Sequence, residues 1–209
     1  MIADAAAAEQ PLIIAYYRRA LPRFEKMRSL IAGGAVGQPR LVQITDYRAH
    51  TARPQDDWRV NPTLSGGGIF FDTQSHTIDW LGYTFGKPSR IRGITARQAE
   101  GYAAEDFVAF TGLFGEVATV ATCAYALGQD REEVTVLGDK GSISMSFFAH
   151  SPLRLRRADG RNELIEIADP EHMHQPFIER VVSYLLDGTK NPCSGAEARQ
   201  VNAVLSDIY

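Results

Sequence analysis

Several large classes of protein are excluded by what this 209-residue sequence lacks. Its only two cysteines, Cys123 and Cys193, are too few for a disulfide framework or a zinc site, and they favour the reducing cytoplasm as the location. No apolar run approaches the roughly 20 residues that a membrane-spanning helix needs, and the N-terminus does not resemble a signal peptide. A net charge of −3 gives no basic surface for nucleic acid. We therefore expect neither a membrane nor a nucleic acid as a partner.

The sequence also lacks the common glycine-rich motifs. The glycines at 33, 34 and 37 and the run at 66–68 do not fit G-x-G-x-x-G. Neither the phosphate-binding loop G-x-x-x-x-G-K-[ST] nor the hydrolase motif G-x-S-x-G occurs. The chain therefore has no recognisable nucleotide-phosphate loop of its own.

What is present is the composition of a globular protein, with strands between two groups of helices. Hydrophobic residues make up 44% of the chain, which is long enough for one large domain or two small ones. Helices are predicted from Pro22, over 69–85, from Gln175, and from Ser194, where Ser194 and Glu197 fit a capping box. Apolar and β-branched stretches predict strands at 41–50, 91–98, 106–114, 117–127, 133–137, 142–148, 153–157 and 163–167.

The consecutive strands predict the fold class. Turn signals at 138–141 and 159–160 each join two of them into a hairpin, and we expect the series to form an antiparallel meander. With helices ahead and behind, this is an α+β fold: a large, mostly antiparallel open sheet with helices packed on one face. The other face can meet water or a second subunit.

The first 17 residues do not look like the beginning of a domain. Residues 1–10 resemble the tail of a helix, and residues 11–17 are an apolar run that predicts a buried strand. Such a strand needs neighbours that the chain does not supply upstream. We therefore expect the chain to be a fragment of a longer protein.

The segment from Gly66 to Asp79 is the strongest functional signal. Asp72, His76 and Asp79 stand at i, i+4 and i+7, within about 60° of one another on a helical wheel, opposite an apolar face. A carboxylate one turn from an imidazole can hydrogen-bond it and raise its basicity, which suits removal of a hydroxyl proton. Two alternatives stay open: a capping aspartate beside a half-buried histidine, or a divalent cation shared by Asp72 and His76. Asp79 is expected to orient a neighbour or to cap locally.

Other candidate contacts lie on either side of this segment. Arg59, next to Trp58, could bind a carboxylate or phosphate, or could anchor a loop through an ion pair. Tyr16, Tyr17, Arg18 and Arg19 lie where a strand would end and a helix begin, as ligand contacts or as a solvated charge pair beside core aromatics. For His172 and His174 we expect no role.

These residues, in this order and spacing, resemble one family. The most specific element is G-G-G-x-x-x-D-x-x-x-H-x-x-D at 66–79, and weaker matches lie at 15–22, 31–37, 58–59, 137–142, 175–179, 192–197 and 208–209. The pattern resembles the C-terminal half of the glucose-fructose oxidoreductase / inositol dehydrogenase / MocA (Gfo/Idh/MocA) family of NAD(P)-dependent oxidoreductases, over nearly the whole chain.

The resemblance implies a division of the chain and roles for its residues. Residues 1–17 would be the end of an N-terminal dinucleotide-binding (Rossmann) domain, and residues 18–209 a C-terminal domain for substrate binding, catalysis and oligomerisation. Asp72 and His76 would be catalytic. Candidate substrate contacts are Tyr17, Arg18, Arg59 and Asp79, and candidate cofactor contacts are Trp58 and Gly67. NAD or NADP would be bound mainly by the N-terminal domain, and the family's Glu-Lys-Pro motif is missing from this chain.

Three functions follow as hypotheses. In the first, the chain is the substrate-binding and catalytic half of an NAD(P)-dependent oxidoreductase acting on a sugar, polyol or related hydroxy or keto compound. In the second, it is a non-catalytic module for assembly through the sheet. In the third, the same scaffold uses nicotinamide transiently for a redox-neutral glycosidase or lyase reaction. A homo-dimer or tetramer through the open sheet face is expected, with a carbohydrate-like small molecule as substrate.

Overall fold

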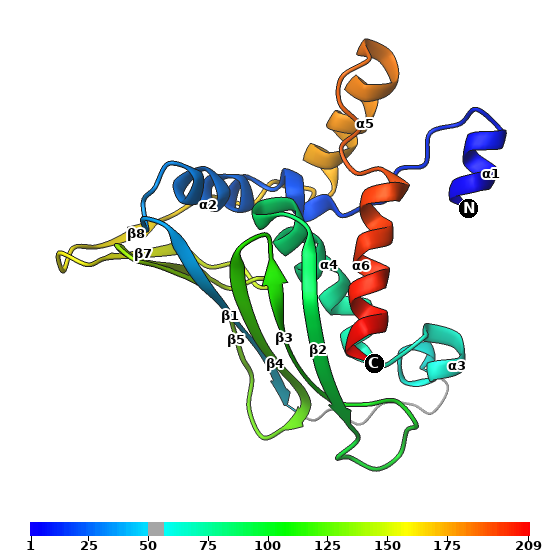
Figure 1. Ribbon diagram of the computed structural model, residues 1–209, viewed down its shortest axis with the longest axis horizontal. Coiled ribbons are helices and arrows are strands. Elements are labelled where there is room, and N and C mark those ends of the chain that lie inside the picture. Colours follow the sequence, from blue (N-terminus) through cyan, green and yellow to red (C-terminus); the bar gives the residue numbers. More distant parts are fainter. Residues whose placement is uncertain (50–56) are drawn as a thin grey trace.

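The computed structural model describes residues 1–49 and 57–209, and it is dominated by one open sheet (Figure 1). The sheet has eight strands in the order β2-β3-β4-β1-β5-β6-β7-β8. Their bounds are β1 Pro39–Ala49, β2 Pro88–Ala96, β3 Phe107–Phe114, β4 Val117–Leu127, β5 Arg131–Gly138, β6 Gly141–Met145, β7 Leu153–Arg157 and β8 Asn162–Ile165. Both predicted hairpins are present, and the predicted α+β class with a mostly antiparallel open sheet is confirmed.

One feature of the topology differs from the predicted meander. Strand β1 lies between β4 and β5, and it pairs parallel with β4 and antiparallel with β5. Strands β4 and β5 are therefore consecutive in sequence but not neighbours in the sheet. Parallel neighbours need a long crossover connection, and here the crossover contains helix α4 (Ile69–Phe85) and the hairpin β2–β3. The prediction of an unbroken antiparallel series is wrong at this point.

The main helices cover one face of this sheet, as predicted. Helix α2 spans Pro22–Ala32 and helix α6 spans Gly195–Ile208, and α6 packs on both α4 and β2. Trp80 of α4 is fully buried in the core, where its ring lies near those of Phe24 and Phe147. The helix-covered face of the sheet and these helices form the hydrophobic core.

The N-terminal segment is not the buried strand that its composition predicts. Helix α1 (Ile2–Ala7) leads into an extended segment whose only bridge within the described residues joins Ile13 to Ser194. The backbone there pairs locally: Ile14 N–H donates to the Cys193 carbonyl, and Gly195 N–H donates to that of Leu12. A short 3₁₀ helix, η1 (Tyr17–Ala20), then leads into α2. Two short helices, η2 (Trp58–Val60) and α3 (Pro62–Ser65), lie ahead of α4, and the predicted strand end at residue 50 lies outside the described residues.

The two C-terminal helices begin where their signals predict. Helix α5 spans Gln175–Asp187 and starts with proline in its first turn. Helix α6 starts at the capping box, in which the Ser194 side chain accepts a hydrogen bond from Glu197 N–H and the Glu197 carboxylate accepts one from Ser194 N–H. Among the helices of residues 1–49 and 57–209, none combines the length and hydrophobicity of a membrane-spanning segment.

Candidate functional site

The glycine run positions the start of α4 by close packing. Gly66 has a positive φ of 83°, and Gly68 N–H donates to Glu105 Oε1 at 2.6 Å. Gly67 is buried, and a Cβ there would lie 2.8 Å from the Tyr209 hydroxyl. These glycines therefore let the Tyr209 side chain and Glu105 approach the backbone at the head of the helix. The expectation that a cofactor contacts Gly67 stays a prediction, because the neighbours described for Gly67 are side chains of this chain.

Asp72 contacts Arg59 instead of the histidine one turn away. The Arg59 Nε donates to Asp72 Oδ2 at 3.0 Å, and both side chains are partly exposed. The Arg59 guanidinium also lies 4.5 Å from the ring centroid of Trp58. No hydrogen bond joins Asp72 to His76 within the described residues, so the predicted direct pair is wrong in this structure. Substrate contact by Arg59 and cofactor contact by Trp58, whose side chain is exposed, stay predictions.

His76 lies among aromatic rings and a buried arginine. The rings of Tyr16 and Tyr17 each lie 5.5 Å from the imidazole, and His76 Nδ1 is buried without a hydrogen-bond partner within the described residues. Burial and then the charge of Arg18 lower the pKa of His76 to about 4, although Asp72 opposes this change. The expectation that Asp72 makes His76 more basic is therefore corrected: at neutral pH the imidazole is neutral.

Arg18 is buried, so the alternative of a solvated charge pair is wrong. Its Nη1 donates to the Phe147 carbonyl at 2.8 Å, and its guanidinium lies 4.8 Å from the Phe148 ring and 5.3 Å from that of Tyr17. Burial lowers the pKa of Arg18. Stacking of a guanidinium on aromatic faces is a common arrangement for a desolvated arginine. Contact of Arg18 and Tyr17 with a substrate stays a prediction.

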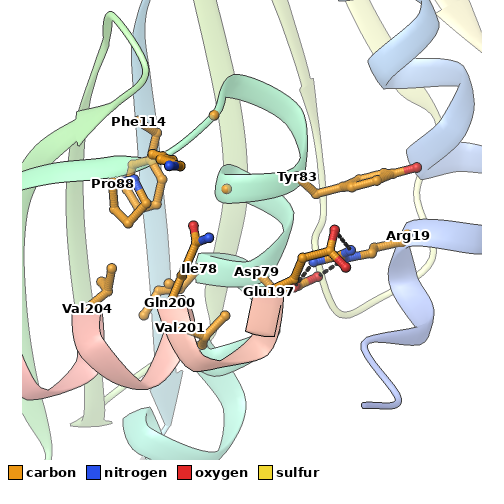
Figure 2. A pocket seen from close by; sticks show the side chains of 13 residues that line it. Arg19, Ile78, Asp79, Tyr83, Pro88, Phe114, Glu197, Gln200, Val201 and Val204 are labelled. Carbon is orange, nitrogen blue, oxygen red and sulfur yellow. Dashed lines mark hydrogen bonds and ion pairs between the residues drawn. The ribbon is translucent and has the colours of Figure 1, made fainter. Parts of the chain in front are cut away.

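Asp79 pairs with Arg19 instead of with the other two members of the predicted stripe. Its two oxygens accept hydrogen bonds from Arg19 Nη2 and Nε, at 2.6 and 2.9 Å, in a pair that is almost fully buried. Figure 2 shows this pair reaching Glu197 of α6, at the wall of a cavity of about 200 Å³ between α4 and α6. Burial opposes the charge of Arg19, but the bonds to Asp79 outweigh it and raise the pKa of the guanidinium. Asp79 thus orients a neighbour, as the residue pattern predicts, and both of its oxygens are occupied; its role as a substrate contact stays a prediction.

Some residues of the site carry no signal in the sequence. The ring of His174 lies 4.1 Å from that of Tyr17, and its charge contributes to the low pKa of His76. Arg48, at the end of β1, and Phe148, after β6, line a cavity of about 270 Å³ together with Thr73, the residue after Asp72. These residues are far apart in the sequence. They become neighbours only in the folded chain, where α4 lies in the connection between the parallel strands β1 and β4. No group of three or more potential metal ligands was found in the part of the chain that the structure describes.

The low pKa of His76 has a measurable consequence for stability. Between pH 4 and 6.5 the imidazole is protonated in the unfolded chain and neutral in the folded chain. Because the unfolded state binds more protons, the free energy of unfolding rises with pH across this window, by up to about 3 kcal/mol from this group. In urea titrations we expect His76→Gln to reduce this rise relative to the unchanged chain. Parallel stability curves for the two chains would show that His76 has an ordinary pKa.

The fold of this chain matches that of solved oxidoreductases. Solved structures with this fold include aldose-aldose oxidoreductase from Caulobacter crescentus (TM-score 0.82, 20% identity, covering 99% of this chain and 64% of that chain). Another is WlbA dehydrogenase from Bordetella pertussis, solved with NADH and UDP-GlcNAcA (TM-score 0.77, 20% identity, covering 98% of this chain and 62% of that chain).

The sequence comparison identifies the family. Residues 24–144 match the GFO/IDH/MocA C-terminal domain, and the chain belongs to this family. A relative, oxidoreductase P35 of Formosa agariphila, is 32% identical over 206 residues, which are 94% of this chain and 61% of that protein. The chain thus spans about three fifths of the length of the curated relatives it matches.

Proposed function

We propose that this chain is the substrate-binding and proton-transfer part of an oxidoreductase that interconverts a hydroxyl and a carbonyl group on a sugar, polyol or related compound, with NAD or NADP. One observation carries the proposal: a neutral imidazole, His76, lies 5.5 Å from each of two tyrosine rings and under the electrostatic influence of the buried Arg18, one turn of α4 after Asp72. The family membership supports redox chemistry, and the NADH and UDP-GlcNAcA held by the Bordetella relative support the nicotinamide and the carbohydrate-like substrate.

The residues of this chain fit the substrate part of such a site and do not fit the dinucleotide part. The sequence has no phosphate-binding glycine loop, and the glycines at 67 and 68 are covered by the chain's own side chains. The proposal therefore assigns the dinucleotide to a domain outside residues 1–209, and the boundary at 17/18 belongs to the same proposal. When bound, nicotinamide supplies the hydride acceptor or donor.

Residues of this chain accept and return the proton of the substrate hydroxyl. In the oxidation direction, the Nε2 of neutral His76 accepts the proton of the substrate hydroxyl, since Nδ1 is buried. The hydride leaves the same carbon, which becomes a carbonyl. Asp72, held by Arg59, and Arg18 provide polar groups beside the imidazole that can orient the substrate. In the reverse direction the imidazolium returns the proton to the forming hydroxyl.

The direct test uses a polypeptide in which residues 1–209 follow a dinucleotide-binding domain. Reduction of NAD⁺ or NADP⁺ is followed by absorbance with a panel of aldoses, polyols and sugar acids. We expect at least one of them to support turnover. If the protein binds the dinucleotide but no compound in the panel reduces it, the proposal is wrong.

The open face of the sheet supports a second proposal, that the chain self-associates into a dimer or tetramer. Side chains that alternate with the buried ones on β1, β3 and β4 are uncharged at the centre of this face, for example Thr45, Thr111 and Val120. Val120 is 42% exposed although it lies on a strand flanked by neighbours on both sides. An uncharged sheet face of this kind can pack against a second copy.

This proposal predicts that a single substitution on the open sheet face lowers the mass of the assembly. Sedimentation equilibrium should give a dimer or tetramer for the unchanged chain and a smaller species for Val120→Arg, because a charge would be buried in the interface. Glu116→Arg, in the β3–β4 turn, is the control and should keep the larger mass. A monomeric unchanged chain, or equal masses for all three proteins, would contradict it.

A further inference from the structure

A buried carboxylate at the end of β1 orients an arginine beside the site. Asp46 and Arg48 lie two residues apart, and hence on the same face of the strand. Asp46 is only 2% exposed. Arg48 Nε lies 2.6 Å from Asp46 Oδ1, and Gln74 Nε2 of α4 donates to Oδ2 at 2.7 Å. The Tyr125 hydroxyl of β4 donates to the same oxygen at 3.4 Å.

Asp46 Oδ2 accepts hydrogen bonds, whereas Oδ1 has only the ion pair with Arg48 Nε, and this pair engages one nitrogen of Arg48. Burial raises the pKa of Asp46, and Arg48 partly offsets this increase. A buried carboxylate is costly unless its partners compensate for lost water. The two terminal nitrogens of Arg48 have no hydrogen-bond partner in residues 1–49 and 57–209, and the side chain remains about one third exposed. A guanidinium held at Nε presents the two-pronged donor edge that matches an oxyanion.

The donor edge of Arg48 belongs to a cavity that is connected to the surroundings of His76 through Thr73 of α4 and the Phe148 ring. Arg48 lines the cavity of about 270 Å³ with Thr73, Tyr125 and Phe148. Thr73 follows Asp72 on α4, and the Phe148 ring lies 5.7 Å from the Arg48 guanidinium and 4.8 Å from that of Arg18. Arg18 in turn acts electrostatically on His76. Thr73, which lines this cavity, lies three residues before His76 on α4, which is less than one turn of the helix.

The acidic groups nearby do not compete for this edge. Glu132 accepts hydrogen bonds from the backbone N–H groups of Phe147 and Phe148 and from the Ser146 hydroxyl. Asp72 accepts from Arg59. Because these carboxylates already accept hydrogen bonds from other groups, they leave the terminal N–H groups of Arg48 available to a molecule in the cavity.

We propose that this cavity is the specificity pocket of the site, and that Arg48, positioned by Asp46, binds an anionic substituent of the substrate, a carboxylate or a phosphate. The proposal rests on the proposed function and narrows its substrate class to anionic sugars and hydroxy acids. Asp46 is a positioning residue in this account, and Gln74 and Tyr125 keep its carboxylate in place.

The test compares three sugars that differ only at carbon 6: D-glucuronate, D-glucose 6-phosphate and D-glucose. Calorimetric titration of the full polypeptide with NAD⁺ present should show that D-glucuronate, D-glucose 6-phosphate or both bind at least tenfold more tightly than D-glucose. Arg48→Met should remove this preference, weakening the anion by about 10- to 100-fold while leaving D-glucose unchanged. Arg48→Lys should restore part of it, since the charge returns without the two-pronged edge. The anionic sugar whose binding weakens more in Arg48→Met identifies the substituent, carboxylate or phosphate, that Arg48 binds.

The control is Arg40→Met, because Arg40 is an exposed arginine on the same strand whose contact with Asp139 is long, at 3.8 Å. It should bind like the unchanged protein. Equal binding of all three sugars, binding of none, or an equal loss for all three in Arg48→Met would overturn the proposal. Failure of the proposed function gives a different result: an Arg48-dependent preference in titration without any nicotinamide turnover.

Discussion

Replacing His76 with asparagine is expected to lower kcat by about 10²- to 10⁴-fold in the polypeptide that carries the dinucleotide domain. Asparagine preserves polarity and approximate size but cannot accept a proton at neutral pH. Because His76 is neutral at that pH, the unchanged protein always holds the base in its working form. The dissociation constant of the dinucleotide should not change, since its binding is assigned to another domain. Steady-state kinetics and dinucleotide titration together provide the measurement.

Two controls separate this effect from general damage to the fold. His172→Asn changes an exposed histidine in the segment before α5 and should keep full activity. Unfolding in urea should show that His76→Asn remains folded. If His76→Asn turns over as fast as the unchanged protein, then the imidazole is not the base, and a role in packing between Tyr16 and Tyr17 would account for its position.

Arg19→Met is expected to lower the free energy of unfolding by about 3–5 kcal/mol, enough to unfold a marginal domain. The change leaves the Asp79 carboxylate buried without its two hydrogen bonds. It also removes the contact with the Tyr83 ring, which lies 4.7 Å from the guanidinium, and the bond to the Pro192 carbonyl. Urea unfolding followed by circular dichroism measures the loss.

The matched control and the double variant make this prediction specific. Arg161→Met removes an arginine whose partner, Asp159, is on the surface, and the unfolding midpoint should not change measurably. Arg19→Met combined with Asp79→Leu should recover part of the loss, because the orphaned charge disappears. Equal midpoints for Arg19→Met and Arg161→Met would contradict the importance of the buried pair, and so would a double variant less stable than either single one.

Local patterns in the sequence were sufficient for most of the fold. The period of apolar residues from Ile69 to Phe85 predicts α4 with its bounds, and the Ser194–Glu197 box predicts the start of α6. Both are interactions within a few residues. Insertion of β1 between β4 and β5 depends on contacts between residues about 80 positions apart, for example Ile44 with Ala121. No local signal encodes this register, and the same is true of residues 11–17, whose apolar side chains pack without forming a ladder.

The positions of the candidate residues on α4 could be predicted from the sequence, but their contacts could not. Spacing on a helix places Asp72 and His76 on one side of α4, but it cannot tell that Arg59 takes the carboxylate or that burial lowers the pKa of the imidazole. Helical spacing also groups Asp79 with them, whereas in the structure Asp79 pairs with Arg19, which also contacts Glu197 of α6. Arg48 and His174 are single polar residues without a motif, and only the folded chain shows what they face.

The most direct test of the central claim is the fate of the carbinol hydrogen. The full polypeptide is incubated with NAD⁺ or NADP⁺ and with aldoses and sugar acids deuterated at the oxidised carbon, and the reduced nicotinamide is analysed by mass spectrometry. The account predicts that deuterium appears on the nicotinamide with the unchanged protein and is nearly absent with His76→Asn. Product formation without deuterium on the nicotinamide, or equal labelling in both proteins, would contradict it.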